Sequence, residues 1–421
     1  MESLIIKGGN KLYGSVTISG AKNAALPILA ATILAEGNYK ISNVPYLRDV
    51  YTMNKLLGTL GVNCNHENGF VDITNTLKSG DCVASYDLVK TMRASILVLG
   101  PLLAKYKKAK VALPGGCAIG ERPVNYHIAA LEKMGANIEV SGGYINAVCD
   151  KLVGCEIVFD KVTVTGTENL LMAACLAEGS TVLQNAAREP EVKDLANFLR
   201  SMGAKIEGDG TTTIKIDGVK QLNSTDYTVM PDRIEAGTFL CAVAGCGGKI
   251  TINNCPVSSM DAIIEKLRAT GLNINIINDN TIEAESNGKI KAVDIETFPY
   301  PGFPTDMQSQ FMAVMLKADG VSVINESIFE NRFMHVPEFK RMGADISLND
   351  SNAIIKGCKN FSGAPVMASD LRASAGLVIA ALMADNTSEI HRIYHLDRGY
   401  EFFEKKLSAL GADIRRVKSE R

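Results

Sequence analysis

One short pattern occurs six times along the chain, and this repetition constrains the fold more than any other feature. The pattern is an amphipathic segment, a glycine and a short alternating segment, as in LEKMGANIEV and FKRMGADISL. Its glycines are Gly61, Gly135, Gly203, Gly271, Gly343 and Gly411, separated by 74, 68, 68, 72 and 68 residues. Self-similarity at a nearly fixed period indicates a repeated structural unit. Each copy predicts a helix that ends at a glycine with positive φ, followed by a strand.

A second element recurs between these glycines. It is a segment that is apolar on nearly all sides, as in LLMAACLAEGSTVLQN and FMAVMLKADGVSVINE, which predicts a buried helix. Six units of this length are too long for solenoid repeats and have too few strands for propeller blades. We therefore expect an α/β fold in which sheets wrap buried helices, with two globes of three pseudo-symmetric units each. A cleft at a hinge between the globes is the expected ligand site, and a scaffold of repeats without a site is the alternative.

The composition excludes several classes of partner. The 44 Lys and Arg residues nearly balance the 46 Asp and Glu residues, and a net charge of −2 gives no drive toward nucleic acid or a membrane surface. The longest segments without a charged residue, 23–35 and 236–248, have 13 residues each. A membrane span needs about 20. The N-terminus does not resemble a secretory signal, so we expect a cytoplasmic protein with no membrane and no nucleic-acid partner.

Cysteine and histidine spacing does not indicate a metal site. The ten cysteines form no CxxC pair and mostly lie in apolar segments, as Cys175 and Cys241 do, which is typical of buried, reduced thiols. His391 and His395 have the spacing of a ligand pair, but no third partner is near in sequence and no HExxH motif occurs. We expect no metal and no cofactor.

A polar, often charged cluster precedes each apolar helix, such as SGAKN at 19–23 and ASDLRA at 368–373. Helix N-termini attract anions, and Ser, Thr and Asp there are also ordinary N-caps, which is the alternative for each cluster. A cation at that end costs about 0.3 to 1 kcal/mol, and capping does not require one. The cations in these clusters are Lys22, Arg93, Arg233 and Arg372. They predict an anionic ligand.

Residues 114–120, PGGCAIG, hold three glycines and one proline, which predicts an exposed loop. Cys117 is therefore expected to be accessible, unlike the other cysteines, and Arg122 is close enough to favour its thiolate. A catalytic thiol is one interpretation, and an incidental loop cysteine is the alternative. Pro123 fits the first position of the following helix.

Together these motifs resemble the UDP-N-acetylglucosamine enolpyruvyl transferase family, from residue 3 to about residue 416. The matching segments are KNAALP, PGGCAIGERPV, YPGFPTDMQ, IFENRFMHVPE, SDLRASAGLVIAAL and HLDRGYE. The related 5-enolpyruvylshikimate-3-phosphate synthases lack the cysteine loop and the IFENRF segment, and they are the alternative. The resemblance implies a two-domain inside-out α/β barrel of six repeats, with 1–20 plus 230–421 as domain I and 21–229 as domain II.

The resemblance also implies an activity. The enolpyruvyl group of phosphoenolpyruvate would be transferred to the 3′-hydroxyl of UDP-N-acetylglucosamine, releasing phosphate, in the first committed step of bacterial peptidoglycan synthesis. Roles in cell-wall biogenesis, cell shape and cell division would follow, as would closure of the domains on nucleotide-sugar binding. Cys117 at the acid position implies sensitivity to fosfomycin, which alkylates that thiol. A catalytically silent paralogue that binds the UDP-sugar is a further alternative, and the oligomeric state stays open.

Residue roles follow from the same resemblance. Cys117 would protonate C3 of phosphoenolpyruvate, and Asp306 would accept the proton of the sugar hydroxyl. The other catalytic residues would be Lys22, Arg398 and Asp370. The residues implied for phosphoenolpyruvate binding, whose cations suit its phosphate and carboxylate, are Lys22, Asn23, Arg122, Arg372 and Arg398. Those implied for UDP-N-acetylglucosamine are Asn23, Arg93, Arg122, Pro123, Val124, Asn125, Tyr126, Thr163, Val164, Thr165, Gly166, Asp306 and Ile328.

Several of these roles have a structural alternative. Asp306 could cap the helix after it, Lys22 could be a solvated surface charge, and Arg398 could be a salt-bridge partner at a helix start. His395 and Asp397 are expected to orient the Arg398 loop.

The chain departs from the family pattern at two places. Asn125 stands where the family often has Asp, which leaves a uracil-side contact open. The phosphate loop reads TVTG at 163–166 in place of Ser-Val-Gly, which leaves the individual phosphate contacts open.

Overall fold

The chain is described here by a computed structural model, which covers residues 2–78, 82–90, 92–113, 124–358 and 361–418. These residues divide into two compact units. Unit 1 contains the described residues up to 19 and from 231 onward, and unit 2 contains the described residues from 20 to 230. Each unit has its own hydrophobic core.

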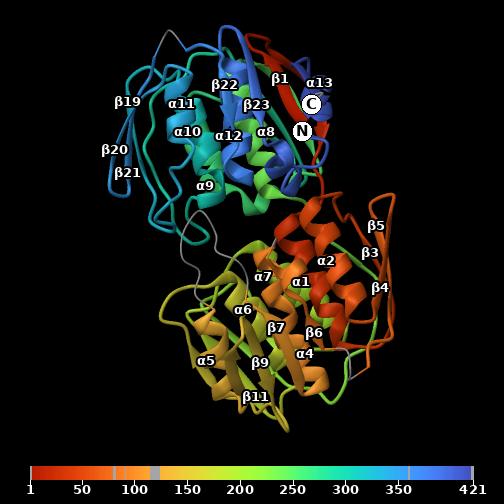
Figure 1. The fold of residues 1–421 in the computed structure, drawn as a ribbon. Coiled ribbons are helices and arrows are strands. Elements are labelled where there is room, and N and C mark those ends of the chain that lie inside the picture. Colours follow the sequence, from red (N-terminus) through yellow and green to blue (C-terminus); the bar gives the residue numbers. More distant parts are fainter. Residues whose placement is uncertain (1, 79–81, 91, 114–123, 359–360, 419–421) are drawn as a thin grey trace. The chain divides into compact units, whose positions relative to one another are not determined.

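Three nearly fully buried helices form the centre of unit 1. They are α8 (Arg233–Cys246), α10 (Gln308–Met315) and α12 (Leu371–Met383), and they pack against one another with the strands outside them (Figure 1). A short 3-10 turn, η4 (Thr305–Met307), leads into α10. The corresponding helices of unit 2 are α1 (Lys22–Ala31), α4 (Leu99–Tyr106) and α6 (Val164–Ala174). In unit 2, η1 (Thr32–Leu34) follows α1 and η2 (Arg93–Val98) precedes α4. The prediction that the apolar segments are buried helices is confirmed.

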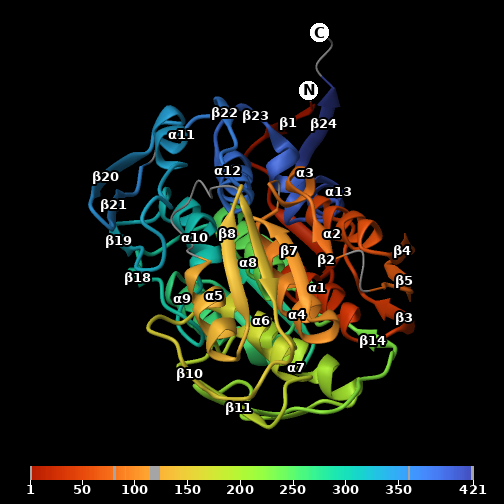
Figure 2. The ribbon, with the colours of Figure 1, turned by 60° about the horizontal axis from the view of Figure 1, so that its bottom comes forward.

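The described strands form six sheets of four strands, and all six share one pairing scheme. An edge strand runs parallel to its neighbour, and the two remaining pairings are antiparallel, as for β7, β9 and β8 (Figure 2). In unit 2 the orders are β6-β7-β9-β8, β10-β11-β13-β12 and β14-β3-β5-β4, and in unit 1 they are β22-β23-β1-β24, β16-β17-β15-β2 and β18-β19-β21-β20.

The strand bounds of unit 2 are β3 Gly37–Ser42, β4 Val62–Glu67, β5 Phe70–Asn75, β6 Val83–Ala84, β7 Lys108–Ala112, β8 Asn137–Ser141, β9 Tyr144–Val148, β10 Glu156–Val158, β11 Ser180–Gln184, β12 Lys205–Glu207, β13 Thr213–Asp217 and β14 Tyr227–Thr228. Those of unit 1 are β1 Glu2–Lys7, β2 Leu12–Thr17, β15 Gly248–Asn253, β16 Asn273–Asn278, β17 Thr281–Ser286, β18 Ile295–Glu296, β19 Val321–Asn325, β20 Asp345–Asn349, β21 Asn352–Lys356, β22 Pro365–Met367, β23 Thr387–His391 and β24 Asp413–Lys418.

Three of these sheets include a strand from a distant part of the chain. β1 lies between β23 and β24, and β2 pairs with β15 in parallel, with Leu12 opposite Gly248. In unit 2, β14 pairs with β3 in parallel, with Tyr227 opposite Ile41. The N-terminal strands therefore complete unit 1, and β14 completes unit 2 just before the chain returns to unit 1.

The second helix of each pattern is amphipathic and ends at the repeated glycine. These helices are α2 (Arg48–Thr59), α5 (Asn125–Lys133), α7 (Pro190–Ser201), α9 (Asp261–Ala269), α11 (Val336–Arg341) and α13 (Phe403–Ala409). The six glycines have φ between 93° and 105°, so the predicted positive φ is confirmed at each. The described part of α5 begins at Asn125, and Pro123, which was expected at the first position of this helix, lies outside the described residues. The remaining short helices are α3 (Tyr86–Val89), η3 (Val257–Ser259) and η5 (Ile393–Arg398).

The nine described cysteines are reduced thiols, and they are less uniformly buried than expected. Four are buried, namely Cys82, Cys175, Cys241 and Cys255, whereas Cys64, Cys149, Cys155, Cys246 and Cys358 are partly exposed. Even so, burial raises the pKa of the Cys64 thiol to about 12. Within the described parts of the chain, every helix is too short or too polar to cross a membrane.

Candidate functional site

In unit 1, two guanidinium groups bind the carboxylate of Asp306. Arg332 Nη2 lies 2.8 Å from Oδ1, while Arg372 Nε and Nη2 lie 3.1 and 3.0 Å from Oδ2. Asp306 lies on η4, Arg332 follows β19, and Arg372 lies in the first turn of α12. Both arginines are nearly fully buried, at 5% and 1% exposure. Because an unpaired buried charge is costly, this carboxylate stabilises both cations.

Asp306 does not cap a helix. No side-chain capping hydrogen bond occurs at the described N-termini of η4 or α10, and its carboxylate binds the arginines instead. The capping alternative for Asp306 is therefore wrong.

Arg372 stays a cation in this setting. Burial lowers its pKa, but Asp306, Tyr400 and Asp232 act against burial, and the net result is a pKa above the usual value. The Tyr400 ring centre lies 5.4 Å from the guanidinium carbon.

A buried polar network supports Asp306 from the core side. Gln310 Nε2 donates to the backbone oxygen of Asp306 at 2.8 Å and also lies 2.9 Å from the Tyr400 hydroxyl. That hydroxyl lies 3.0 Å from Thr238 Oγ1. The network thus joins α8, α10 and the residue that packs against Arg372.

Asp370 caps helix α12. Its Oδ1 accepts hydrogen bonds from the backbone N–H groups of Arg372 and Ala373 at 2.8 and 3.0 Å. The carboxylate therefore has a structural role that orients the first turn bearing Arg372.

His335 and Arg332 lie near this cap, and the sequence did not indicate either as a site residue. Burial lowers the pKa of His335 to about 4, with Asp370 raising it and Arg332 lowering it further. The only available signal was their position in the IFENRFMHVPE segment, since their roles depend on contacts with residues far along the chain.

Arg398 ends η5, so the alternative that places it at a helix start is wrong. Asp397 accepts hydrogen bonds from Arg416 at 2.6 and 3.1 Å, and Arg416 also binds Glu404 at 2.9 Å. Asp397 therefore ties η5 to β24. Arg398 is the next residue on η5, so the expectation that Asp397 and His395 orient the Arg398 loop stays a prediction.

In unit 2, Lys22 is the first residue of α1 and is only 8% exposed. Its Nζ lies 3.4 Å from Asp49 Oδ2. The alternative of a solvated surface charge is therefore wrong, and Lys22 is a buried cation at the N-terminus of a core helix. Asn23 follows it on α1.

His127 is a third residue that the sequence did not indicate. It is buried on α5, and its Nδ1 lies 2.9 Å from Asn169 Nδ2. Because an amide nitrogen donates, Nδ1 accepts, and neutral His127 carries its proton on Nε2, which lies 3.5 Å from Thr165 Oγ1. Burial and then Arg93 lower its pKa to about 4. The structure thus brings together the predicted Arg93 and Thr165 around a neutral imidazole.

The other predicted residues have simpler surroundings. Thr163 caps α6 by accepting from Gly166 N at 3.2 Å, so capping explains its hydroxyl. Val124, Asn125 and Tyr126 lie at the start of α5. Val164 begins α6, and Ile328 follows β19. Cys117, Arg122 and Pro123 lie outside the described residues.

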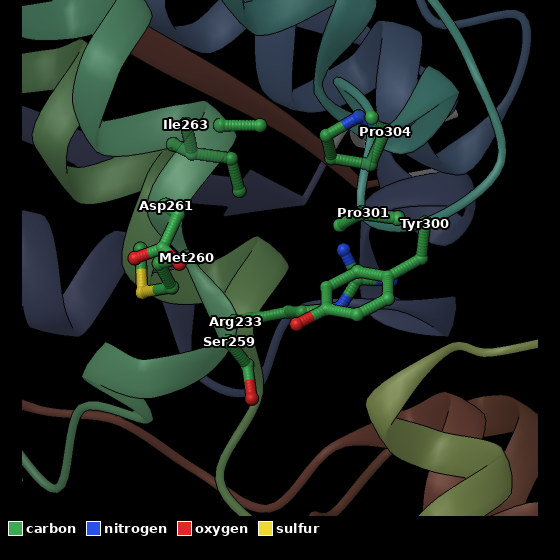
Figure 3. Close-up of a pocket in the computed structure, with 10 residues that line it drawn as sticks. Arg233, Ser259, Met260, Asp261, Ile263, Tyr300, Pro301 and Pro304 are labelled. Atoms are coloured by element: carbon green, nitrogen blue, oxygen red, sulfur yellow. The ribbon is translucent and has the colours of Figure 1, made fainter. Parts of the chain in front are cut away.

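Arg233 lies in a separate setting within unit 1 (Figure 3). A small, open pocket is lined by Arg233, Ser259, Asp261, Tyr300 and their neighbours. The guanidinium carbon of Arg233 lies 5.6 Å from the centre of the Tyr300 ring. Asp232 caps α8 by accepting from Ile234 N and Glu235 N at 2.8 and 3.2 Å.

Comparisons with known proteins give one consistent result. A family profile described as EPSP synthase (3-phosphoshikimate 1-carboxyvinyltransferase) matches residues 6–407. The chain is 57% identical over 417 residues to the UDP-N-acetylglucosamine 1-carboxyvinyltransferase of Geotalea uraniireducens, covering 99% of this chain and all of that one. It is 56% identical over 424 residues to the protein of the same name from Thermodesulfovibrio yellowstonii, with 99% and 100% coverage.

Solved structures show the same mixed α/β fold. The enolpyruvyl transferase NikO from Streptomyces tendae superposes with a TM-score of 0.88 at 23% identity, covering 100% of this chain and 99% of that one. An EPSP synthase from Acinetobacter baumannii superposes with a TM-score of 0.76 at 20% identity, covering 99% and 100%. At these identities the likeness concerns the fold alone.

Proposed function

The chain belongs to the EPSP synthase (3-phosphoshikimate 1-carboxyvinyltransferase) family, and from that membership we propose that it acts as a UDP-N-acetylglucosamine 1-carboxyvinyltransferase. It is a transferase that moves the enolpyruvyl group of phosphoenolpyruvate to the 3′-hydroxyl of UDP-N-acetylglucosamine and releases phosphate. The observation that carries this conclusion is identity of 56 to 57% over essentially the whole chain to proteins of that name.

The reaction proceeds by addition and elimination. Asp306 accepts the proton of the sugar hydroxyl as its oxygen bonds to C2, and Cys117 supplies the proton that C3 takes up. The bond from C2 to the phosphate oxygen then breaks, and C3 loses a proton, which restores the vinyl group. The two arginines beside Asp306 support this role because they favour an ionised carboxylate, and only the ionised form accepts a proton.

Phosphoenolpyruvate carries a phosphate and a carboxylate, which cationic side chains bind. We assign its phosphate and carboxylate to Lys22, Asn23, Arg122, Arg372 and Arg398, and we add Arg332 because it shares the Asp306 carboxylate with Arg372. Guanidinium groups bind such anions with two parallel hydrogen bonds, and they also stabilise the charge on the departing phosphate. The burial of Lys22 and Arg372 supports this assignment, because electrostatic attraction to an anion is stronger away from water.

The proposed contacts of the nucleotide sugar are Asn23, Arg93, Asp306, Ile328 and the residues 122–126 and 163–166. The neutral His127 beside Thr165 adds a hydrogen-bond donor to this set. Asp370 acts by holding the first turn of α12 in place.

The remaining expectations belong to the same proposal. The two units are the two domains of an inside-out α/β barrel fold, each built from three copies of a unit with one buried and one amphipathic helix. The shared sheet order and the six positive-φ glycines support this. The product would enter cell-wall synthesis in the cytoplasm, and Cys117 would make the enzyme a target of fosfomycin.

Phosphate release with two acceptors tests the function. Purified protein with phosphoenolpyruvate and UDP-N-acetylglucosamine is expected to release phosphate, whereas shikimate-3-phosphate in place of the UDP-sugar is expected to release none. Release only with shikimate-3-phosphate would assign the protein to the sister activity. Release with neither acceptor would favour a silent paralogue that binds the UDP-sugar.

A further inference from the structure

Glu326 is a buried carboxylate that no step of the proposed reaction uses. It follows β19, is 3% exposed, and accepts four hydrogen bonds. Its Oε1 accepts from Thr297 Oγ1 at 2.9 Å and from the backbone N–H groups of Ile328 and Phe329 at 3.0 and 3.2 Å. Its Oε2 accepts from Thr305 Oγ1 at 2.9 Å. One side chain thus connects the segment after β19 with the residue that precedes Asp306.

Two connections lead from Glu326 to Arg332. The first passes through Thr305, whose Oγ1 accepts from Arg332 Nη1 at 3.0 Å while Nη2 of the same guanidinium binds Asp306 at 2.8 Å. The second passes through Phe329, whose ring centre lies 5.4 Å from the Arg332 guanidinium carbon. A hydroxyl has a single proton. Because Thr305 gives that proton to Glu326, its lone pairs face Arg332.

We propose that Glu326 is a positioning residue for the transfer reaction: through the Thr305 hydroxyl it sets the direction of the Arg332 guanidinium against Asp306, and through the Ile328 and Phe329 N–H groups it holds the adjacent segment. This rests on the proposed function, in which Asp306 accepts the substrate proton and Ile328 contacts the sugar. Misplacement of a reacting group by about 1 Å can lower a rate about a hundredfold, so such a support is needed.

Glu326→Gln separates the two connections. The oxygen of the new side chain can still accept from Thr297 and the two backbone N–H groups, but its amide nitrogen then faces Thr305. If the amide of the new glutamine flips, its N–H groups face the backbone N–H groups of Ile328 and Phe329, which excludes that orientation. Thr305 must therefore accept from the new amide as well as from Arg332, and its own proton loses its acceptor. The segment at 328–329 stays capped, while the hydrogen bond between the new side chain and Thr305 is reversed and the Thr305 proton has no acceptor.

The test measures kcat and KM for the wild type and four variants, with thermal unfolding as a check on folding. Glu326→Gln and Thr305→Val are each expected to lower kcat about tenfold or more, with KM for UDP-N-acetylglucosamine within about twofold. Thr305→Ser keeps the hydroxyl and is expected to retain most of kcat. Glu296→Gln, an exposed substitution on the neighbouring strand β18, is the matched control and is expected to leave kcat unchanged.

Three outcomes would overturn the inference: kcat of Glu326→Gln within about twofold of the wild type, equal losses in Thr305→Ser and Thr305→Val, or a change confined to KM. If Glu326→Gln fails to fold, Thr305→Val takes its place, because it tests the same connection. Failure of the proposed function is separate, because it appears in the wild type as absence of turnover with the UDP-sugar. The variants are then compared on shikimate-3-phosphate, and lack of turnover with both acceptors would overturn the inference too.

Discussion

The guanidinium of Arg372 donates two hydrogen bonds to a single carboxylate oxygen of Asp306, from Nε at 3.1 Å and from Nη2 at 3.0 Å. The two residues are 66 positions apart and belong to η4 and α12, which lie at neighbouring core helices. The pair fixes the carboxylate in one orientation, while the other oxygen binds Arg332.

Arg372→Lys tests this pair. A lysine has one point charge and cannot form both of the hydrogen bonds that Arg372 makes to Oδ2, so we expect kcat to fall at least about tenfold. The free energy of unfolding should fall by about 2 kcal/mol, because part of a buried charge pair loses its partner. Phosphate release and urea unfolding measure the two effects. Arg341→Lys on α11, at a largely exposed ion pair with Glu338, is the control and should change neither quantity. Wild-type values for Arg372→Lys would contradict the role.

Asp306→Asn removes the proposed proton acceptor without changing the size of the side chain. We expect kcat to fall by about 10² to 10⁴, the range for loss of a general base. Binding of UDP-N-acetylglucosamine, followed by calorimetry, should weaken only a few-fold. Asp385→Asn serves as the control, because Asp385 is exposed and its Oδ1 lies 3.5 Å from Lys317 Nζ. Turnover of the Asp306→Asn variant near that of the wild type would exclude Asp306 as the base.

Substitution of Cys117 separates its acidity from its reactivity. Cys117→Ser is expected to lose labelling by fosfomycin, because the serine hydroxyl is a poor nucleophile toward the epoxide. Cys117→Asp is expected to keep some turnover and to resist the drug, because a carboxylic acid can still donate a proton. Mass spectrometry of the intact protein measures the label. Cys64→Ser should label like the wild type, since burial raises the Cys64 pKa to about 12. Labelling that persists in Cys117→Ser would contradict the assignment.

His127 is expected to make stability depend on pH. Its pKa is about 4 in the folded chain and about 6.5 in the unfolded chain, so the unfolded state binds a proton first as the pH falls. The stability due to neutral His127 is therefore complete above pH 6.5 and is lost as the pH falls toward 4, by up to about 3 kcal/mol.

The comparison of wild type with His127→Gln isolates this effect from His335, whose pKa is also lowered to about 4 and which contributes in the same direction. The difference in unfolding free energy between wild type and variant should shrink from pH 7 to pH 4. An NMR titration that gives His127 a pKa near 6.5 in the folded protein would refute the prediction.

Substitution of two glycines near the end of α2 by alanine is expected to have opposite effects on stability. Gly61 has φ of 93°, so Gly61→Ala forces a left-handed conformation on alanine and should cost about 1 to 2 kcal/mol. Gly58 lies within α2, and a Cβ built there meets nothing within 4 Å. Gly58→Ala should therefore stabilise the helix by about 0.5 to 1 kcal/mol. Urea unfolding measures both changes in the free energy of unfolding. If the two changes had the same sign, backbone conformation would not explain the effect of alanine at these positions.

Much of the fold could be predicted from local sequence. A helix that is apolar on all sides must be buried, and a glycine that ends an amphipathic segment favours positive φ, so both features follow from residues a few positions apart. Asp306 is identified through the family resemblance of the YPGFPTDMQ motif, and its role stays a prediction. The sheets that include β1, β2 and β14 could not be predicted, because strand pairing depends on partners elsewhere in the chain, more than 180 residues away for Tyr227 and Ile41.

By itself, then, the sequence determined the repeated helix ends, the buried core helices and the family to which the chain belongs. Only the tertiary structure decided that Arg332 and Arg372 bind Asp306, that His127 lies beside Thr165, and that Asp397 binds Arg416. The physical reason is one of range. Backbone preference and hydrophobic periodicity act over a single turn or strand, whereas the charge of a buried side chain is balanced by whichever residue the packing of the core brings within hydrogen-bond distance.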